Sequence, residues 1–459
     1  MIDRAILLDV FRRAVRGCDP AVRVTFGMLG IDKLEALAGR RFGIAVGKAA
    51  LAMARGAGAV EDGVAVVPAD DGEPLPPGWR RVISAHPLID ARSQAAFDIA
   101  IRIVEDDVGA EDVLLVLISG GASSLLEAPR GDITLAELRA VTSAVMDAGV
   151  AIEALNTVRG ALSIAKAGGL VLNCAGSVIT LAVSDVVDDD LAVIGSGPTF
   201  GPWLAAGQST KDIDVLDFED PGAPADQPLV DMSAIIGPTY ISAAHDVDVG
   251  EADAALRRRA RALLDHLAIA CPPSVDAVLA MPDEAFLVRR SDTAQVVAPM
   301  RGFAAAAHTV LAGEVAAAPQ FLEAPLVGDV EACAARLVGL GAGTYVAWGE
   351  PTLVIPADHG EGGRAQQLAL VLARALRGTA GIALVAGSDG IDGPAPAARP
   401  TPAGAIVDGQ TWDAIVAAGI DPEAALARRD AGTALAAVDA LVVTGPTGIN
   451  HADLVILRR

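Results

Sequence analysis

A short apolar run in the first third of the chain constrains the fold more than any other feature. Residues 113–118 are all aliphatic, with the length and branching of a β-strand that is buried on both faces. The run stops abruptly at a loop of serine, glycine and alanine, residues 119–124. Strands of this kind are typical of α/β sheets, which bind ligands at the carboxyl ends of their strands. The stretch therefore predicts a strand that leads into a candidate binding loop.

The composition of this loop suits an anion. Gly120 and Gly121 allow tight backbone turns and leave N–H groups uncovered, while Ser119 and Ser123 offer short hydroxyl donors. A phosphate could be held here without a lysine. An ordinary strand-to-helix turn is the alternative, and it is the better interpretation when the stretch is considered alone. Four other strand-like runs that end in similarly polar loops favour the binding role.

Apolar runs alternate with helical patterns along the chain, which predicts an α/β fold. Residues 344–348 and 352–355 are expected to form a hairpin, and residues 201–250 an irregular excursion without clear periodicity. The other predicted strands span residues 42–46, 64–67, 81–84, 177–183, 295–298, 382–386, 440–444 and 453–457. Predicted helices span residues 92–105, 134–148, 152–167, 251–268, 273–280, 302–311 and 330–340, with two more within 1–40 and one beginning near 364.

Composition limits the class of protein and its partners. The 459 residues are enough for two domains with full cores, and a net charge of −23 makes nucleic acid and anionic membranes poor partners. Although 52% of the residues are hydrophobic, no run approaches the roughly 20 apolar residues that span a bilayer. The N-terminus lacks the apolar core of a signal peptide, so we expect a cytoplasmic protein. Four widely spaced cysteines argue against a disulfide framework and a zinc site.

Lysine is scarce, which draws attention to the position of each one. The lysines are Lys33, Lys48, Lys166 and Lys211. Lys48 lies where the strand at 42–46 meets an alanine-rich helix, so its ammonium and the positive end of the helix would act on the same anion. The surrounding GIAVGKAA departs from GxxxxGK[ST], which excludes a Walker A loop. A surface lysine without a role is the alternative.

His86, Asn156 and Arg159 are further binding candidates. His86 follows the strand at 81–84, where it would either touch a substrate or be an ordinary loop histidine. Asn156 and Arg159 are three residues apart on a predicted helix and share a face. That face points either to solvent or into a cleft.

Four aspartates crowd the exit of the strand at 177–183: Asp185, Asp188, Asp189 and Asp190. Like charges so close together are unfavourable unless cations or solvent relieve them, so a magnesium-nucleotide site is one explanation. An exposed acidic loop is the other, and it is favoured for Asp188 and Asp190. Asp185 directly follows the strand and is the better chemical candidate.

Two features of the C-terminal part also suggest a charged ligand. Arg364 lies in the first turn of a predicted helix, where its charge opposes the helix dipole unless a bound anion offsets it. Asp389 lies on a glycine-rich loop directly after the strand at 382–386.

Taken together, these loops resemble the glycerate 2-kinase family with a MOFRL-type C-terminal domain. The matching stretches follow the family's order across nearly the whole chain. They are GKAA at 47–50, AHP at 85–87, LISGGASSLL at 117–126, LNTVRGALSIAKAGGL at 155–170, SDVVDDDLAVIGSGPT at 184–199, GEPT at 349–352, GEGGRAQQLAL at 360–370, AGSDGIDGP at 386–394, AGAIVDG at 403–409 and TGPTGINHADL at 444–454.

The resemblance implies a kinase that uses ATP and Mg²⁺ to phosphorylate the C2 hydroxyl of D-glycerate or a related 2-hydroxy acid. It implies a Rossmann-like parallel-sheet domain over 1–290 and a MOFRL-type α/β domain over 291–459, with the active site in the cleft between them. Lys48 and Arg364 would then be catalytic cations, and Asp185 or Asp189 would handle the metal or the substrate hydroxyl. The binding residues would be Ser119, Gly120, Gly121, Ser123, His86, Asn156, Arg159 and Asp389.

Other readings stay open. Some similar proteins are labelled hydroxypyruvate reductases, but here no GxGxxG fingerprint follows a strand. The chain also departs from the family's usual residues, with Gly160-Ala161 in place of Lys-His, and with Ala365, Gln367 and Ile449 in place of polar residues. These departures suggest an altered substrate pocket or a retired paralogue that only binds a small acid or nucleotide. A homodimer is one possible assembly.

Overall fold

The computed structural model describes two compact units. Among the described residues, the parallel-sheet unit takes residues 20–298, and the mixed-sheet unit takes residues 2–19 together with 299–459. The described residues are 2–31, 39–150, 152–186, 189–200, 239–241, 249–281, 292–356, 358–395 and 399–459. Most of the predicted excursion at 201–250 therefore lies outside them.

The parallel-sheet unit is built on a seven-stranded sheet with the order β3-β2-β1-β4-β5-β7-β6. All neighbouring strands are parallel except β6 and β7. The strands are β1 (Arg41–Val46), β2 (Gly63–Val67), β3 (Trp79–Ile83), β4 (Val113–Ile118), β5 (Ser177–Val183), β6 (Thr239–Ile241) and β7 (Thr293–Ala298). The predicted Rossmann-like sheet is confirmed, with the aliphatic run at 113–118 as its middle strand.

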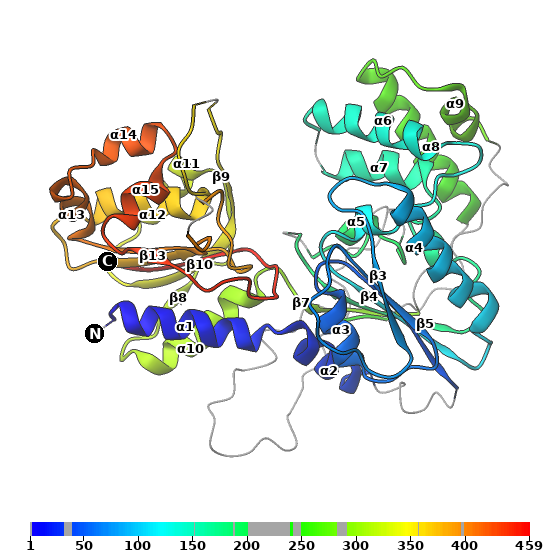
Figure 1. Cartoon of the computed structure of the whole chain (residues 1–459), viewed down its shortest axis with the longest axis horizontal. Helices are drawn as coiled ribbons and strands as arrows, with labels where there is room; N and C mark the ends of the chain where they lie inside the picture. Colours follow the sequence, from blue (N-terminus) through cyan, green and yellow to red (C-terminus); the bar gives the residue numbers. More distant parts are fainter. Residues whose placement is uncertain are drawn as a thin grey trace. The chain divides into compact units, whose positions relative to one another are not determined.

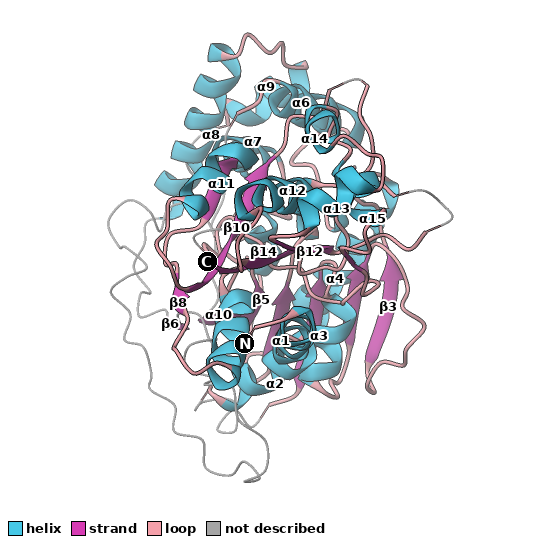
Figure 2. Ribbon diagram, turned by 90° about the vertical axis from the view of Figure 1, so that its left-hand side faces the viewer, coloured by secondary structure: helices cyan, strands magenta, loops and turns pink. Residues whose placement is uncertain are grey.

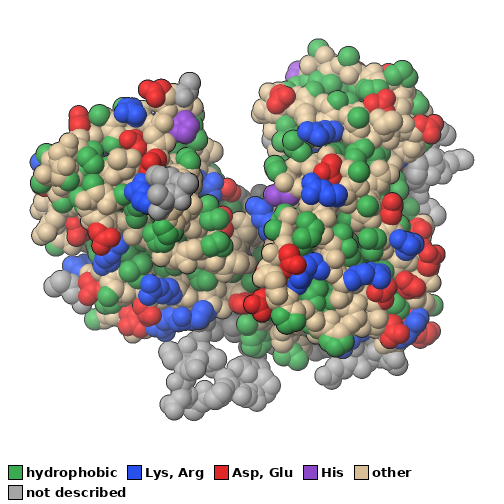
Figure 3. All heavy atoms as spheres, in the orientation of Figure 1, with side chains coloured by type: hydrophobic (Ala, Val, Ile, Leu, Met, Phe, Trp, Pro, Cys, Tyr) green, Lys and Arg blue, Asp and Glu red, His purple; other side chains and the backbone are tan. Residues whose placement is uncertain are grey.

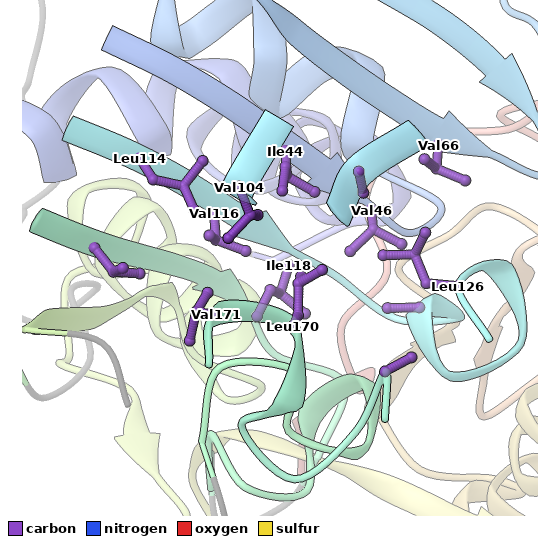
Figure 4. Close-up of a cluster of buried hydrophobic side chains, with 14 of the residues drawn as sticks. Ile44, Val46, Val66, Val104, Leu114, Val116, Ile118, Leu126, Leu170 and Val171 are labelled. Carbon is purple, nitrogen blue, oxygen red and sulfur yellow. The ribbon is translucent and has the colours of Figure 1, made fainter. Parts of the chain in front are cut away.

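Helices cover both faces of this sheet because consecutive strand residues point to opposite sides. Ala45 and Leu115 pack with α2 and α3, whereas Ile44 and Val116 pack with α4 and the turn at 169–171 (Figure 4). A separate apolar cluster joins α6, α7, α8 and α9 (Figure 1). The helices are α2 (Pro20–Leu29), α3 (Ala50–Ala57), α4 (Ala91–Arg102), α5 (Ala122–Leu125), α6 (Leu135–Asp147), α7 (Ile152–Leu162), α8 (Val249–His266) and α9 (Pro273–Leu279).

The mixed-sheet unit has the strand order β13-β12-β11-β14-β10-β8, with β9 also paired to β10. Figures 1 and 2 show α1 and α10 on one face of this sheet and α11 to α15 on the other. The strands are β8 (Gln320–Phe321), β9 (Leu326–Asp329), β10 (Thr344–Thr352), β11 (Ile382–Ala386), β12 (Gly404–Asp408), β13 (Leu441–Val442) and β14 (Asp453–Arg458). The helices are α1 (Arg4–Gly17), α10 (Gly302–Glu314), α11 (Val330–Val338), α12 (Arg364–Leu376), α13 (Thr411–Ala417), α14 (Pro422–Ala427) and α15 (Ala431–Ala436).

The two units differ from the predicted division at residue 290. Residues 2–19 belong with the C-terminal part because α1 packs on α10, where the Phe11 and Phe303 rings meet edge to face at 5.4 Å. Arg4 also donates to the carbonyl of Leu441, at 2.9 Å. The strand β7, on the other side of the predicted boundary, pairs with β5 and so belongs to the parallel sheet.

The predicted hairpin at 344–355 is wrong. Residues 344–352 form the single strand β10, because its first part pairs with β14 and its last part pairs with β9. Gly349 allows the strand to pass from one partner to the other, with φ of +151° and no room for a side chain beside the backbone of Leu326. Its neighbour Glu350 therefore projects from a strand and not from a turn.

The predicted helix over 152–167 is too long. The helix α7 ends at Leu162, because Ser163 forms a β-bridge with Pro129 and the Ile164 N–H donates to the Ala128 carbonyl at 2.9 Å. Residues 163–170 therefore run as an extended and turning segment, which matters for the loops described below.

The surface and the cysteines agree with the composition. On the face drawn in Figure 3, acidic and basic side chains are interspersed over both units. The four cysteines form no disulfide, and Cys18, Cys174 and Cys333 are buried. Within the described part of the chain, no helix is long and apolar enough to cross a membrane.

Candidate active site

The loops that follow β1 and β4 are joined by hydrogen bonds. The backbone N–H of Lys48 donates to the Gly120 carbonyl at 2.8 Å, and the N–H of Ala49 donates to the Ser119 Oγ at 3.1 Å. Gly47 makes this approach possible, since a Cβ there would lie 2.1 Å from the Ser119 Oγ. Lys48 is therefore held at the carboxyl edge of the sheet, beside the glycine-serine loop.

His86 completes this group from the loop after β3. Its Nδ1 lies 2.9 Å from the Ser124 Oγ, and a Cβ added to Gly121 would lie 3.2 Å from the His86 Cε1 and 3.4 Å from the Lys48 Cγ. Partial desolvation and the charge of Lys48 lower the pKa of the imidazole below 6.5, so it is neutral at pH 7. Lys48, His86 and Gly121 thus line one small exposed surface, with a cation next to a neutral ring.

A chain of hydroxyl and amide groups connects the loop to α7. The Ser123 Oγ lies 2.8 Å from the Ser196 Oγ, which in turn donates to the Asn156 Oδ1 at 2.9 Å. Ser196 was not singled out from the sequence. The sequence feature that could have pointed to Ser196 is its position between two glycines, Gly195 and Gly197. In the structure all three residues have φ between 60° and 62°.

Arg159 shares the helix with Asn156 but belongs to a more buried group. Burial lowers the pKa of its guanidinium, while the Glu127 carboxylate opposes this effect. The charge of Arg159 also acts on the buried Lys166. The two residues predicted to act together therefore interact with different groups. Asn156 accepts from the Ser196 hydroxyl, whereas the charge of Arg159 interacts with Glu127 and Lys166.

The aspartates after β5 have different local roles. Asp185 and Asp189 are both half-buried, and Asp189 has a left-handed backbone with φ of +54°. Asp190 was expected on an exposed loop, but it is half-buried and accepts from the Ala192 N–H at 2.8 Å, which stabilises its own turn. Asp188 lies outside the described residues. Within the described ranges, no group of three or more carboxylate, histidine or cysteine side chains could hold a metal ion.

In the mixed-sheet unit, Arg364 is held between two carboxylates. Its Nε and a terminal nitrogen donate to both oxygens of Asp453, at 2.7 and 3.2 Å, and its other terminal nitrogen donates to Glu350 at 2.7 Å. Burial alone would lower the pKa of the guanidinium, but Asp453 and Glu350 raise it above its usual value. The buried carboxyl of Asp453 has a raised pKa because of desolvation, which Arg364 opposes.

The anion expected to offset Arg364 is therefore supplied in part by the protein itself. Asp392 adds to this, since its carboxylate accepts from the N–H groups of Ala365 and Gln366, at 3.0 and 2.8 Å, and so caps α12. Burial and the charge of Asp453 raise the pKa of Asp392 to about 6, against these hydrogen bonds. Gly363 leaves room for the carboxylate, because a Cβ there would lie 2.2 Å from the Asp392 Oδ1.

Asp389 lies near this group, on the loop after β11. Its Oδ1 accepts from the Ile391 N–H at 2.9 Å, and its charge contributes to the raised pKa of Asp453. Asp389 is thus part of an acidic environment around Arg364, which its glycine-rich loop brings close to β14.

The departures from the family's usual residues lie in apolar packing. A Cβ on Gly160 would lie 3.1 Å from a methyl of Leu256 on α8, and Ala161 is buried in the same cluster. Ala365 and Ile449 are also buried, and the Gln367 side chain donates to the Leu426 carbonyl at 3.0 Å. Gly160, Ala161, Ala365 and Ile449 thus have packing roles and Gln367 has a hydrogen-bonding role, while the altered pocket suggested by sequence stays a prediction.

Comparison with known proteins decides the family. A family model described as a domain of unknown function, DUF4147, matches residues 6–215, and the MOFRL family model matches residues 343–453. The chain is 30% identical to the D-glycerate 2-kinase of Thermotoga maritima over 463 residues, which cover 99% of this chain and 97% of that protein. The chain belongs to the glycerate 2-kinase family. The resemblance inferred from the motifs is confirmed.

The fold of the glycerate 2-kinase family extends over the whole chain. The crystal structure of the Thermotoga maritima glycerate kinase aligns with a TM-score of 0.75 at 26% identity, and the alignment covers 99% of this chain and 98% of that one. An Agrobacterium vitis protein named as a candidate hydroxypyruvate reductase is 32% identical over 91% of this chain and 98% of its own length. Both names thus occur within one family.

Proposed function

We propose that this member of the glycerate 2-kinase family is an ATP-dependent kinase that phosphorylates the C2 hydroxyl of D-glycerate or a closely related 2-hydroxy acid. The observation that carries the proposal is the joined group at the sheet edge, where Lys48 is bonded through its backbone to a loop of glycines and serines. Phosphoryl transfer needs accurate placement of charges and donors and little covalent chemistry from the protein. The group at the sheet edge supplies a positive charge, from Lys48, and hydrogen-bond donors, from the loop of glycines and serines.

In this proposal each described residue acts through charge or hydrogen bonding. Lys48 and the donors of residues 119–123 hold phosphate oxygens of ATP, which supplies the transferred group. The neutral His86 and the Ser123–Ser196–Asn156 chain orient the small acid, whose hydroxyl needs directional hydrogen bonds. Arg159 contributes positive charge from the group that it forms with Glu127 and Lys166. The close approach of Lys48, His86 and Gly121 supports this role, because the glycine leaves the surface open to a ligand.

Arg364 contributes the second cation, with Asp389 near it. Asp453 already fixes the guanidinium in a bidentate arrangement, so its position needs no reorganisation. Glu350 is exposed, and its contact is the one that a phosphate oxygen would replace most easily. We propose that Arg364, like Lys48, acts on phosphate oxygens through its positive charge.

Asp185 and Asp189 are the proposed ligands of Mg²⁺. Magnesium in kinases is held by one or two carboxylates, with phosphate oxygens and water completing its shell, so two aspartates fit without a larger acidic cluster. The metal would neutralise charge on the phosphates.

An assay of ADP release tests the activity. The purified protein should release ADP in the presence of D-glycerate, ATP and magnesium, and the product should carry the phosphate on C2. L-glycerate and lactate serve as comparison acids. The reductase name of the Agrobacterium vitis relatives is tested in parallel, by following nicotinamide absorbance with hydroxypyruvate. Rapid nicotinamide oxidation without ADP release would exclude the kinase proposal.

Substitution of Gly121 tests whether the surface beside Lys48 and His86 is the site. Gly121→Ala should lower turnover by about 10- to 100-fold, because the new Cβ displaces neighbouring groups and a shift of about 1 Å can cost a hundredfold. Gly149→Ala is the matched control, since Gly149 also has a positive φ but its Cβ would meet nothing within 4 Å. Both variants should lose about 1–2 kcal/mol of stability. Equal turnover in the two variants would place the site elsewhere.

Asp189→Asn should weaken magnesium-dependent ATP binding by about tenfold or more, since it removes a charged ligand. Asp190→Asn is the control, because its side-chain oxygen can still accept from the Ala192 N–H. Calorimetric titration of ATP at several magnesium concentrations measures the effect. Identical titrations for Asp189→Asn and the parent protein would remove Asp189 from the metal site.

A further inference from the structure

Lys166 is a buried lysine that the proposed chemistry does not use. Only 1% of the residue is exposed, and its Nζ donates to the carbonyl of Leu126, which directly follows α5. Burying an ammonium is costly unless other groups compensate. In a chain with so few lysines, such a position calls for a specific interaction.

Glu127 is the partner that compensates this charge. The Glu127 Oε2 lies 3.9 Å from the Lys166 Nζ, and its other oxygen accepts from the Ser163 hydroxyl and from the Ala128 N–H. Glu127 is also buried. The charged groups that act on Lys166 are Glu127, from the segment after α5, and Arg159, from α7.

The segment that carries Lys166 touches both loops of the candidate site. On one side, the Ile164 N–H donates to the Ala128 carbonyl and Lys166 donates to Leu126, so the segment that follows the glycine-serine loop and α5 is fixed. On the other side, the N–H groups of Ala167 and Gly168 donate to the carbonyls of Ser196 and Gly197, at 3.2 and 2.8 Å. Ser196 is the residue that joins Ser123 to Asn156.

We propose that Lys166, together with Glu127, is a positioning residue that holds the glycine-serine loop and the Ser196 turn in register with each other. The ammonium draws the carbonyl of Leu126 and the carboxylate of Glu127 toward the segment at 163–168, and the backbone of that segment fixes the Ser196 turn. Lys166 itself touches no substrate. The assignment of this loop to nucleotide binding rests on the proposed function, whereas the structural role of Lys166 rests only on the contacts described above.

The protonation of Lys166 gives this link a pH dependence. Burial and the charge of Arg159 lower the pKa of the ammonium from 10.5 to about 8, and Glu127 opposes them. Above about pH 8 the amine loses its charge and its attraction to Glu127, so the two loops should become less ordered. Between about pH 8 and 10.5 the unfolded chain holds more protons than the folded one, so this group makes the free energy of unfolding rise with pH. Loop order and global stability should therefore change in opposite directions.

The test compares the parent protein with the double variant Glu127→Gln/Lys166→Met, which removes both charges of this pair and leaves Arg159 as the remaining charge of the group. Lys166→Met alone leaves the Glu127 carboxylate buried without its cation, so the double variant is the informative one. Hydrogen exchange read by mass spectrometry should be about tenfold faster over residues 119–126 and 195–198, with other segments unchanged. The value of kcat/KM should fall about tenfold for ATP and for D-glycerate, because the Ser196 turn belongs to the chain that is proposed to orient the acid.

The pH profile supplies the decisive outcome. The protection of these two segments, relative to the intrinsic exchange rate at each pH, should fall above about pH 8 in the parent protein and should show no such step in the double variant. Asp276→Asn, which alters the exposed pair between Arg261 on α8 and Asp276 on α9, is the control and should leave both segments unchanged. Unchanged exchange in the double variant overturns the proposal, whether or not the protein phosphorylates glycerate. Altered exchange without kinase activity in the parent overturns only the proposed function.

Discussion

Replacing Lys48 with alanine should lower turnover with D-glycerate and ATP by about a hundredfold or more, which is the scale of losing one preorganised charge contact. The side chain is exposed and lies next to Gly121 and His86. Among the described residues, the short loop after β1 contains no other lysine or arginine that could replace it. Stability should change little, because the backbone bonds of residues 48 and 49 to the neighbouring loop remain.

Two further variants separate charge from shape at this position. Lys48→Met keeps most of the length and should be as inactive as Lys48→Ala, while Lys48→Arg keeps the charge and should retain part of the activity. Steady-state kinetics with saturating D-glycerate measures all three. The pKa of His86 should also rise when the neighbouring cation is removed, which NMR titration of the imidazole can follow. Full turnover in Lys48→Met would remove Lys48 from the mechanism.

Arg364→Ala should also lower turnover by about a hundredfold, and unlike Lys48→Ala it should destabilise the protein. The substitution leaves the buried Asp453 carboxylate without its bidentate partner. Breaking such a pair costs about 3–5 kcal/mol when it is fully buried, and we expect about 2–3 kcal/mol here because 35% of the Arg364 side chain is exposed. Chemical denaturation and the ADP-release assay measure the two effects separately.

The same helix offers a matched control for Arg364. Arg374 pairs with the exposed Glu331 and Glu423 on the surface, so Arg374→Ala should change neither stability nor turnover by much. The double variant Arg364→Ala/Asp453→Asn should recover most of the lost stability but none of the turnover. If turnover returned with stability, Arg364 would be a structural residue and its proposed catalytic role would fail.

The elements that sequence predicted best are the buried strands. The predicted limits of β4, β5 and β11 agree with the structure, because a strand buried on both faces must be continuously apolar. The strand β10 was split into a hairpin, since Gly349, Glu350 and Pro351 have the composition of a turn. Only the pairing with β9 and β14, which are distant in sequence, shows that the chain continues straight on.

The candidate site shows the same division between local and distant information. The loop at 119–124 and Lys48 could be placed from sequence, because each lies at the end of an apolar run. The partner of Arg364 could not, since Asp453 lies 89 positions later in the chain. Neither could the link from Ser123 through Ser196 to Asn156, in which three separate segments meet. The catalytic and metal-binding roles of these residues stay predictions.

The position of β14 has a consequence for the order in which the protein folds during synthesis. This strand lies between β11 and β10 and carries Asp453, yet it spans residues 453–458. The ribosome must therefore release the chain through residue 458 before the middle of that sheet can close and Arg364 can pair with Asp453. The helix α1 is made before the parallel sheet and waits until α10 has been synthesised. A nascent chain that stalls before residue 453 would thus contain every strand of the parallel sheet but lack the strand that joins β10 to β11.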